Sequence, residues 1–206
     1  MHKHLTATVA ALTVFGFANS TSAAQFSTSS NSIAANGDTA FSFNVIGLTP
    51  PTQNVTLALN FTQPNFFDLE AVLQAPTGQV LTVFQSPSAS GIFNGTLSDL
   101  GATNVDSIFG AGSFTGTFAP SGQSTISGSL PASTIFDFSG FNGVDPNGIW
   151  TLTFNNAGGS GGSLTGASTI LDITPVPFEF SPAIGIASLA GMYAFRKLRR
   201  QQKVKK

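Results

Sequence analysis

Between residues 25 and 174, apolar and polar residues alternate in short runs, and no stretch has helical periodicity. Val, Leu, Leu and Phe occupy every second position of residues 55–61, and Trp, Leu and Phe do so in residues 150–154. A period of two places alternate side chains on opposite faces of a β-strand, so both runs predict half-buried strands with Trp150 in the core. The same pattern predicts further strands at residues 40–46, 78–84 and 163–173.

Turn-forming residues separate these runs, and the apolar content suits a β-sheet core. Gly, Pro, Asn, Asp and Ser stand between the predicted strands, and fifteen of the 20 phenylalanines lie in residues 25–174. We expect about eight to ten short strands in two packed sheets. The fold class predicted for this region is all-β, a jelly-roll-like antiparallel β-sandwich, with no evident internal repeat and a hairpin tip at residues 158–162.

The balanced net charge of -1 hides a strong segregation of charge along the chain. Residues 25–174 contain no Lys, Arg or His, and their eight acidic residues are Asp38, Asp68, Glu70, Asp99, Asp106, Asp137, Asp145 and Asp172. Phosphate backbones and anionic lipids both require clustered basic side chains. This region is therefore expected to bind neither nucleic acid nor an anionic membrane surface.

The same inventory restricts catalysis. The chain has no Cys, both of its histidines precede residue 5, and its single Tyr is Tyr193. Nucleophilic triads, lysine Schiff bases and His-ligated zinc sites cannot be built from residues 25–174. Two acid-based alternatives remain weak: Asp38 and Asp137 lack the turns of an aspartic protease, and Asp68 with Glu70 lacks the partners of a sugar site.

The first 24 residues have the three parts of a secretory signal. Residues 1–4 are polar and basic, residues 5–18 form an uncharged apolar run, and small residues precede a cleavage point after Ala24. The apolar run is too short to span a bilayer. We therefore predict export, with removal of residues 1–24 by signal peptidase.

The C-terminal segment, residues 175–206, has the pattern of a membrane anchor. Residues 180–195 carry no charge, and sixteen helical residues reach about 24 Å, close to the ~30 Å of a hydrocarbon core. Basic residues follow directly, and they begin with Arg196, Lys197, Arg199 and Arg200. Because basic residues stay on the cytoplasmic side, we predict a single transmembrane helix with the body outside.

A short motif stands before this predicted helix. It contains Pro177, Phe178 and Glu179, followed by Ser181 and Pro182. A Pro-x-Glu motif, a transmembrane helix and a terminal basic cluster, in that order, resemble a PEP-CTERM sorting signal in its Pro-Phe-Glu form. The resemblance implies an exosortase, a membrane transpeptidase that cuts near the motif; the alternative is a permanent single-pass anchor.

The body has a resemblance of its own, over residues 33–173. Residues 67–79 (FDLEAVLQAPTGQ), residues 138–152 (FSGFNGVDPNGIWTL) and residues 161–164 (GGSL) are similar to segments of the proprotein-convertase P domain, also named the Homo B domain. The resemblance implies a jelly-roll module that usually accompanies a subtilisin-like protease. This chain has no room for that protease before residue 33.

Eight acids without any basic residue must be solvated, hydrogen-bonded or bound to metal. Asp68 and Glu70 are two residues apart on a predicted strand, so we expect both on its solvated outer face. Oxygen ligands suit Ca²⁺, and Asp68 and Asp99 stand where the P-domain resemblance has acids. Calcium binding by Asp68 and Asp99 is one interpretation; aspartates that only stabilise turns are the other.

Taken together, these patterns predict a non-enzymatic exported module of the cell surface or extracellular matrix. The precursor is expected in the inner membrane, and the processed protein in the envelope or outside the cell, with a surface polysaccharide or a protein as its ligand. Alternatives are an accessory or stability domain of an extracellular hydrolase, or a Ca²⁺-dependent carbohydrate- or protein-binding module.

Overall fold

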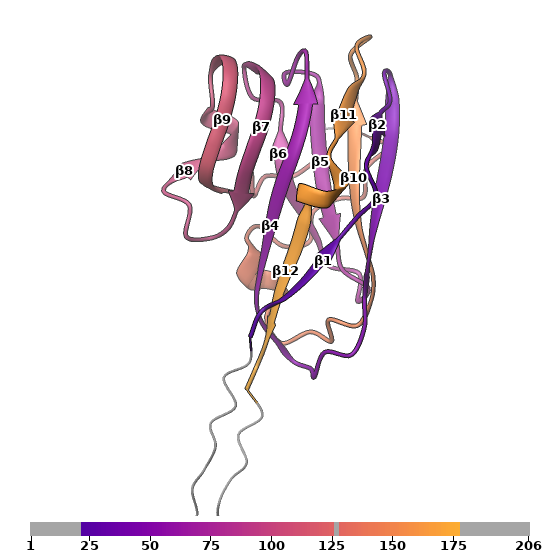
Figure 1. Ribbon diagram of the computed structural model, residues 1–206, viewed down its shortest axis with the longest axis vertical. Coiled ribbons are helices and arrows are strands. Elements are labelled where there is room, and N and C mark those ends of the chain that lie inside the picture. Colours follow the sequence, from indigo (N-terminus) through magenta and orange to yellow (C-terminus); the bar gives the residue numbers. More distant parts are fainter. Residues whose placement is uncertain (1–21, 126–127, 178–206) are drawn as a thin grey trace, which may run out of the picture. The chain divides into compact units, whose positions relative to one another are not determined.

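The computed structural model describes residues 22–125 and 128–177, which form two β-sheets and contain no α-helix. The larger sheet consists of β1 (Ala24–Ser27), β2 (Asn31–Ile33), β4 (Thr52–Gln63), β7 (Ala89–Leu97), β8 (Thr103–Asn104), β9 (Gly110–Ala119), β11 (Gly162–Leu164) and β12 (Ile170–Pro175). The smaller sheet has the order β3 (Gly37–Val45), β10 (Gly148–Asn156), β5 (Leu69–Gln74) and β6 (Val80–Gln85). Three short 3₁₀ turns are η1 (Val105–Ser107), η2 (Phe138–Phe141) and η3 (Gly166–Ser168). The predicted β-sandwich is confirmed at this level (Figure 1).

Facing side chains of the two sheets make the core, and the alternation in the sequence identifies them correctly. In β4 the residues Val55, Leu57, Leu59 and Phe61 are at most 1 % exposed. In β10 the apolar residues at 150, 152 and 154 are fully buried. Phe61 lies at the centre of a phenylalanine cluster, with ring centroids 5.3–5.5 Å from those of Phe66, Phe84, Phe93 and Phe154.

Strand pairing is mostly antiparallel, but β9 departs from the prediction. It runs parallel to β7 over its whole paired length and parallel to β8 at its end. The order along the main path of the larger sheet is β1-β12-β4-β7-β9-β8; off this path, β11 pairs with β4, and β2 pairs with β11. The antiparallel description is therefore wrong for the two pairings that β9 makes.

The parallel pair contains a short repeat that the sequence analysis missed. β7 and β9 share the pattern Gly-x-Phe-x-Gly-Thr, and their glycines, phenylalanines and threonines pair in register. A Cβ at Gly91 would lie 2.1 Å from the carbonyl oxygen of Gly112, and a Cβ at Gly95 would lie 3.0 Å from that of Gly116. The glycines of β7 are thus needed because the backbone of β9 lies against them.

The last predicted strand, residues 163–173, is in fact two. β11 and β12 are separated by η3, at which Gly166 lies against the backbone of the segment before β2: a Cβ there would meet the carbonyl carbon of Ser29 at 2.2 Å. The Gly166 N–H donates to Ser30 Oγ at 2.7 Å. The chain turns at this contact, so β11 pairs with β2 and β4, whereas β12 pairs with β1 and β4.

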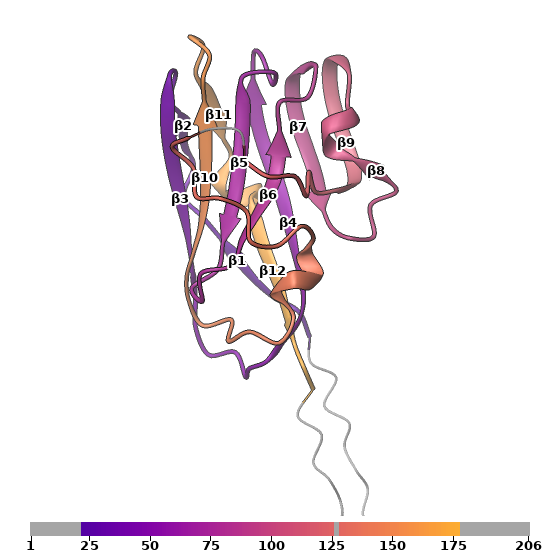
Figure 2. The same cartoon turned by 180° about the vertical axis from the view of Figure 1, so that it is seen from behind.

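The long connection between β9 and β10 covers part of the outer face of the smaller sheet (Figure 2). Thr134 N–H and Ile135 N–H both donate to the Val80 carbonyl oxygen, at 2.9 and 3.1 Å. Leu130 packs with Val72 and Val80 in a small second apolar cluster. As a result, all but the last residue of β5 and every residue of β6 are buried.

No helix in residues 22–125 and 128–177 is long and apolar enough to cross a membrane. The predicted transmembrane helix at 180–195 and nearly all of the predicted signal peptide lie outside the described residues.

Candidate functional site

The first and last strands of the body pair with each other and bring the two chain ends together. β1 and β12 are antiparallel, with Ala24 opposite Ile173 and Ser27 opposite Ile170. Ala24 begins β1 and Pro175 ends β12, and Figure 1 shows both at the same end of the sandwich. The chain therefore enters and leaves the folded body at one end.

A hydrogen bond fixes the exit of the chain. Val176 N–H donates to the Pro51 carbonyl oxygen at 2.8 Å, one residue before the predicted sorting motif. Pro177 is the last described residue. The other predicted motif and anchor residues lie outside the described part: Phe178, Glu179, Ser181, Pro182, Arg196, Lys197, Arg199 and Arg200.

The predicted signal-peptidase site adjoins folded structure. Ala24 is partly buried and is the first residue of β1. Cleavage after Ala24 would leave the pairing of Gln25 with Asp172 in place, where Gln25 Nε2 donates to Asp172 Oδ2 at 3.1 Å.

Asp68, one predicted calcium ligand, lies in the connection between β4 and β5. Its Oδ2 accepts from Asn65 Nδ2 at 2.6 Å, and its carbonyl oxygen accepts from Ala157 N–H at 2.8 Å. Its carboxylate also adjoins Gly158, at which a Cβ would lie 2.5 Å from Asp68 Oδ2. Asp68 thus joins the β4–β5 connection to the loop after β10.

Asp99, the other predicted ligand, follows β7 and faces a different segment. Its two carboxylate oxygens accept from the backbone N–H groups of Phe138 and Ser139, both at 2.8 Å. This arrangement holds the start of η2, whose cap Asp137 accepts from Gly140 N–H at 3.0 Å. The two predicted ligands therefore take part in separate hydrogen-bond networks.

Neither network gathers further acids. Within residues 22–125 and 128–177, no three His, Cys, Asp or Glu side chains lie close enough together to hold one metal ion. A calcium ion at Asp68 or at Asp99 would therefore need backbone carbonyl, amide or water oxygens for the rest of its shell.

Glu70 does not share a solvated face with Asp68, so that expectation is wrong. Glu70 is 2 % exposed, because the β9–β10 connection covers the outer face of β5. Gln85 Nε2 donates to Glu70 Oε1 at 3.4 Å and to the Ser124 carbonyl oxygen at 3.0 Å. The covering segment carries no strand pattern, so alternation within β5 could not reveal this burial.

Asp106 in η1 completes this polar cluster, which the sequence analysis did not identify. Asp106 Oδ1 accepts from Gln85 N–H at 2.9 Å, and Oδ2 accepts from Ser121 Oγ at 2.6 Å. Burial raises the pKa of the Asp106 carboxyl, the hydrogen bonds from Ser121 and Gln85 lower it, and the neighbouring Glu70 raises it. The net shift is upward, so Asp106 holds a proton more readily than an exposed aspartate does.

A polar depression of about 450 Å³ opens where β3 begins and β10 ends in the smaller sheet. Among its lining residues, Asp38 Oδ1 accepts from Asn155 Nδ2 at 2.6 Å and from Ser129 Oγ at 2.9 Å. No imidazole, thiol or amine lines it. Its groups can hydrogen-bond a polar ligand, but they offer no nucleophile with an adjacent base.

Trp150 is part of the core, as predicted, and not a ligand platform. It is fully buried, and its Nε1 donates to the Pro146 carbonyl oxygen at 2.8 Å. Its ring centroid lies 5.0 Å from that of Phe141. The predicted turn before it is stabilised by Asp145, whose Oδ1 accepts from Asn147 N–H at 3.0 Å.

No model of a known protein family matches the chain, and no curated protein is significantly similar to it. The resemblances described above therefore rest on the motifs themselves.

Proposed function

We propose that the protein is a non-enzymatic exported surface module, tethered by its C-terminal helix as a precursor and then processed by an exosortase-type transpeptidase. Its tail carries the proposed signal: Pro177, Phe178 and Glu179, an uncharged segment and a basic terminus, in that order. The mature protein would belong to the cell envelope or the extracellular matrix.

One structural observation supports this proposal above all. β1 and β12 pair at one end of the body, so the segment after the signal peptide and the segment before the sorting motif leave the fold together. A precursor held by both hydrophobic segments can then keep its body on one side of the membrane without strain. An exit at opposite ends would have required one linker to cross the whole sandwich.

Residue chemistry supports a non-enzymatic role. Residues 22–177 contain no Lys, Arg, His, Cys or Tyr, so carboxyl groups are the only ionisable side chains that the body could use in acid–base chemistry. The raised pKa of Asp106 arises inside a cluster of amide and hydroxyl side chains that fastens loops to β6. We assign that cluster to stability.

The finer fold assignment belongs to the same proposal. We interpret the sandwich as a jelly-roll-like module similar to the P domain, in which residues 138–152 provide η2 and the start of β10. The parallel pairing of β9 is a departure from an antiparallel jelly roll.

Mass spectrometry of the mature protein from an exosortase-containing host tests the proposal. We expect a C-terminus at or near the Pro177–Glu179 motif on most molecules and loss of the uncharged and basic segments. Glu179→Gln and Pro177→Ala should leave the unprocessed chain in the membrane fraction, because they alter the motif without changing the folded body.

Asp172→Asn is the matched control, since it neutralises a nearby carboxylate in β12, outside the motif. This variant should be processed as the unaltered protein is. An intact C-terminus ending at Lys206 on most molecules would leave only a permanent anchor. Normal processing of both motif variants would reject this motif as the signal.

A further inference from the structure

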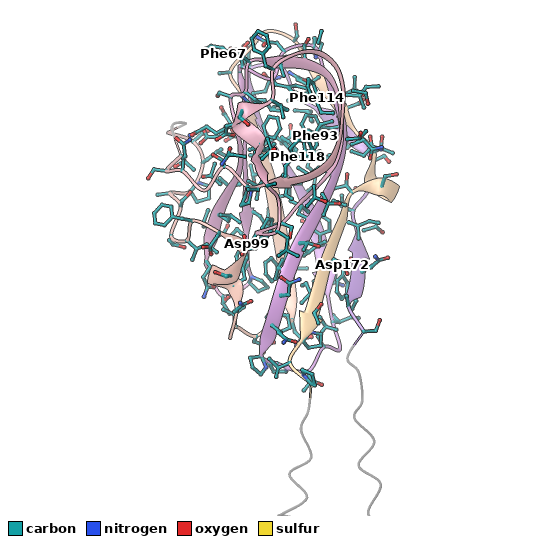
Figure 3. All side chains as sticks on the ribbon, turned by 90° about the vertical axis from the view of Figure 1, so that its left-hand side faces the viewer. Phe67, Phe93, Asp99, Phe114, Phe118 and Asp172 are labelled. Atoms are coloured by element: carbon teal, nitrogen blue, oxygen red, sulfur yellow. The ribbon has the colours of Figure 1, made fainter. Side chains whose placement is uncertain are left out.

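β9 forms an uncovered edge of the larger sheet. Over Gly110–Ala119 it pairs with β7 on one side, and on the other side β8 reaches only Phe118 and Ala119. Among the residues that the structure describes, nothing pairs with the outer edge from Gly110 to Thr117. Figure 3 views the body from this side.

Natural proteins usually protect an edge of this length with Lys, Pro, a bulge or inward-pointing charge. β9 contains no charged residue and no Pro, and its pairing with β7 has no register shift. The acidic residues of the body all lie outside β9. The edge is therefore open to another strand and does not repel a second copy of itself by charge.

The fold already contains one pairing between two such segments, although that pairing is parallel. β7 and β9 carry the same Gly-x-Phe-x-Gly-Thr pattern and lie in register side by side. Phe114 and Phe118 point to the core side, where Phe118 lies 5.4 Å from Phe93 between ring centroids (Figure 3). The alternate residues Ser113, Thr115 and Thr117 are exposed and small enough to leave the edge accessible.

Two large apolar side chains stand exposed at opposite ends of this edge. Phe109, directly before β9, is 83 % exposed, and Leu100 is 88 % exposed. Leu100 adjoins Gly101, at which a Cβ would lie 2.0 Å from the carbonyl carbon of Phe118, so this loop lies against the far end of β9. An antiparallel pair of β9 strands brings the Phe109 end of one copy to the Leu100 end of the other.

We infer that β9 pairs antiparallel with β9 of a second copy of this chain, about a two-fold axis near Ser113 and Phe114. This pairing continues the larger sheet across two molecules and covers both copies of Phe109 and Leu100. A two-fold arrangement uses the same patch on each copy, so it closes at a dimer and does not extend into a fibre.

Strand directions determine how two tethered copies meet. β12 is antiparallel to β4, β4 is antiparallel to β7, and β7 is parallel to β9, so β9 runs in the same direction as β12. The end of β12 marks the exit towards the tail. Antiparallel β9 strands thus place the two exits at opposite ends, so the dimer joins copies on facing surfaces.

Thiol cross-linking tests this interface, because the chain has no Cys of its own. The full-length Ser113→Cys variant is placed, body outward, in two vesicle populations that carry differently tagged protein. A short bis-maleimide should give a dimer containing both tags. Ser42→Cys is the matched control, because Ser42 is exposed on β3 of the other sheet; this variant should give little of the dimer that contains both tags.

Adding Thr115→Lys and Thr117→Lys to Ser113→Cys should abolish most of the cross-link, because charged lysines on an edge strand oppose its pairing with another strand. Should these changes impair folding, as judged by the melting temperature, Leu100→Ser with Phe109→Ser tests the same contact outside the strand. Three outcomes would overturn the inference. The two cysteine positions could give equal yields of cross-linked dimer, or cross-links could form only within one vesicle population. The yield could also stay unchanged in interface variants that fold normally. These outcomes rest on the proposed C-terminal anchor, but they do not depend on exosortase processing.

Discussion

At the scale of single residues, Trp150 connects the sandwich to the turn that precedes β10. Its ring fills the space beside Phe141, and its N–H satisfies the Pro146 carbonyl oxygen. Trp150→Ala should lower the free energy of unfolding by about 3–5 kcal/mol, because it leaves a large cavity. Denaturant unfolding followed by circular dichroism measures this change.

Trp150→Phe separates the packing from the hydrogen bond. It keeps an aromatic ring but leaves the Pro146 carbonyl oxygen without its donor, a loss of about 1–3 kcal/mol for a buried group. We therefore expect the free energy of unfolding of Trp150→Phe to lie between those of the unaltered protein and Trp150→Ala. A Trp150→Ala variant as stable as the unaltered protein would contradict the core position.

Asp106 provides a second test at this scale, through pH. Its pKa is raised above the ordinary value of 3.8, first by burial, so the folded state binds its proton more tightly than the unfolded state does. The stability that Asp106 contributes is fully present below 3.8 and is lost as pH rises through the raised folded pKa. Relative to Asp106→Asn, the unaltered protein should become more stable on acidification through this interval.

Asp145 is the control with the opposite sign. Hydrogen bonds from the backbone and side chain of Asn147 lower the pKa of Asp145, so its contribution is present above 3.8 and lost as pH falls through the folded pKa. We therefore measure the free energy of unfolding of Asp106→Asn and Asp145→Asn as a function of pH. As the pH falls, the differences between each variant and the unaltered protein should change in opposite directions. Parallel profiles for the two variants would refute the assignment at Asp106.

At the scale of elements, alternation predicts a strand correctly where one face meets the core and the other meets solvent. β4 and β10 satisfy this condition, and their buried residues follow from the sequence. β5 fails it, because the β9–β10 connection covers its second face and buries Glu70. No local pattern could reveal that layer, since it arises from contacts between residues far apart in the chain.

Glycine explains the other differences between prediction and structure. In β7 and β9, glycines allow close approach of two backbones, and they interrupt the apolar alternation from which strands are predicted. At Gly166 the contact with Ser29 and Ser30 divides one predicted strand into two. The repeat in β7 and β9 could have been found by comparing the chain with itself at an offset of 21 residues, the difference between Phe93 and Phe114.

The candidate site was predictable only in part. The tail motif can be read directly from the sequence, but the meeting of both chain ends depends on the pairing of β1 with β12. The network of Glu70, Gln85 and Asp106 depends on three separate segments. The order of motifs along the chain was therefore enough to predict the targeting segments. The contacts of the buried acids could be identified only from the folded structure.

At the scale of the whole molecule, the body combines eight acids with no basic side chain. The mutual repulsion of these acids opposes the compact state. Salt weakens this repulsion, because the Debye length falls from ~30 Å at an ionic strength of about 0.01 M to ~8 Å at about 0.15 M. We expect NaCl over this range to raise the melting temperature by a few degrees at neutral pH. Near pH 3, where most carboxyls are protonated, the same salt should have little effect.

Calcium chloride at matched ionic strength distinguishes a bound cation from this general screening. A cation that binds only the folded state adds RT ln(1 + [L]/Kd) to its stability, beyond any effect of ionic strength. If Asp68 holds Ca²⁺ with nearby carbonyl and amide oxygens, CaCl₂ should raise the melting temperature more than NaCl does, and Asp68→Asn should remove that excess. Asp137→Asn removes an equal charge at the cap of η2 and should keep the excess. Identical melting temperatures in the two salts would mean that calcium acts on this protein only as part of the ionic atmosphere.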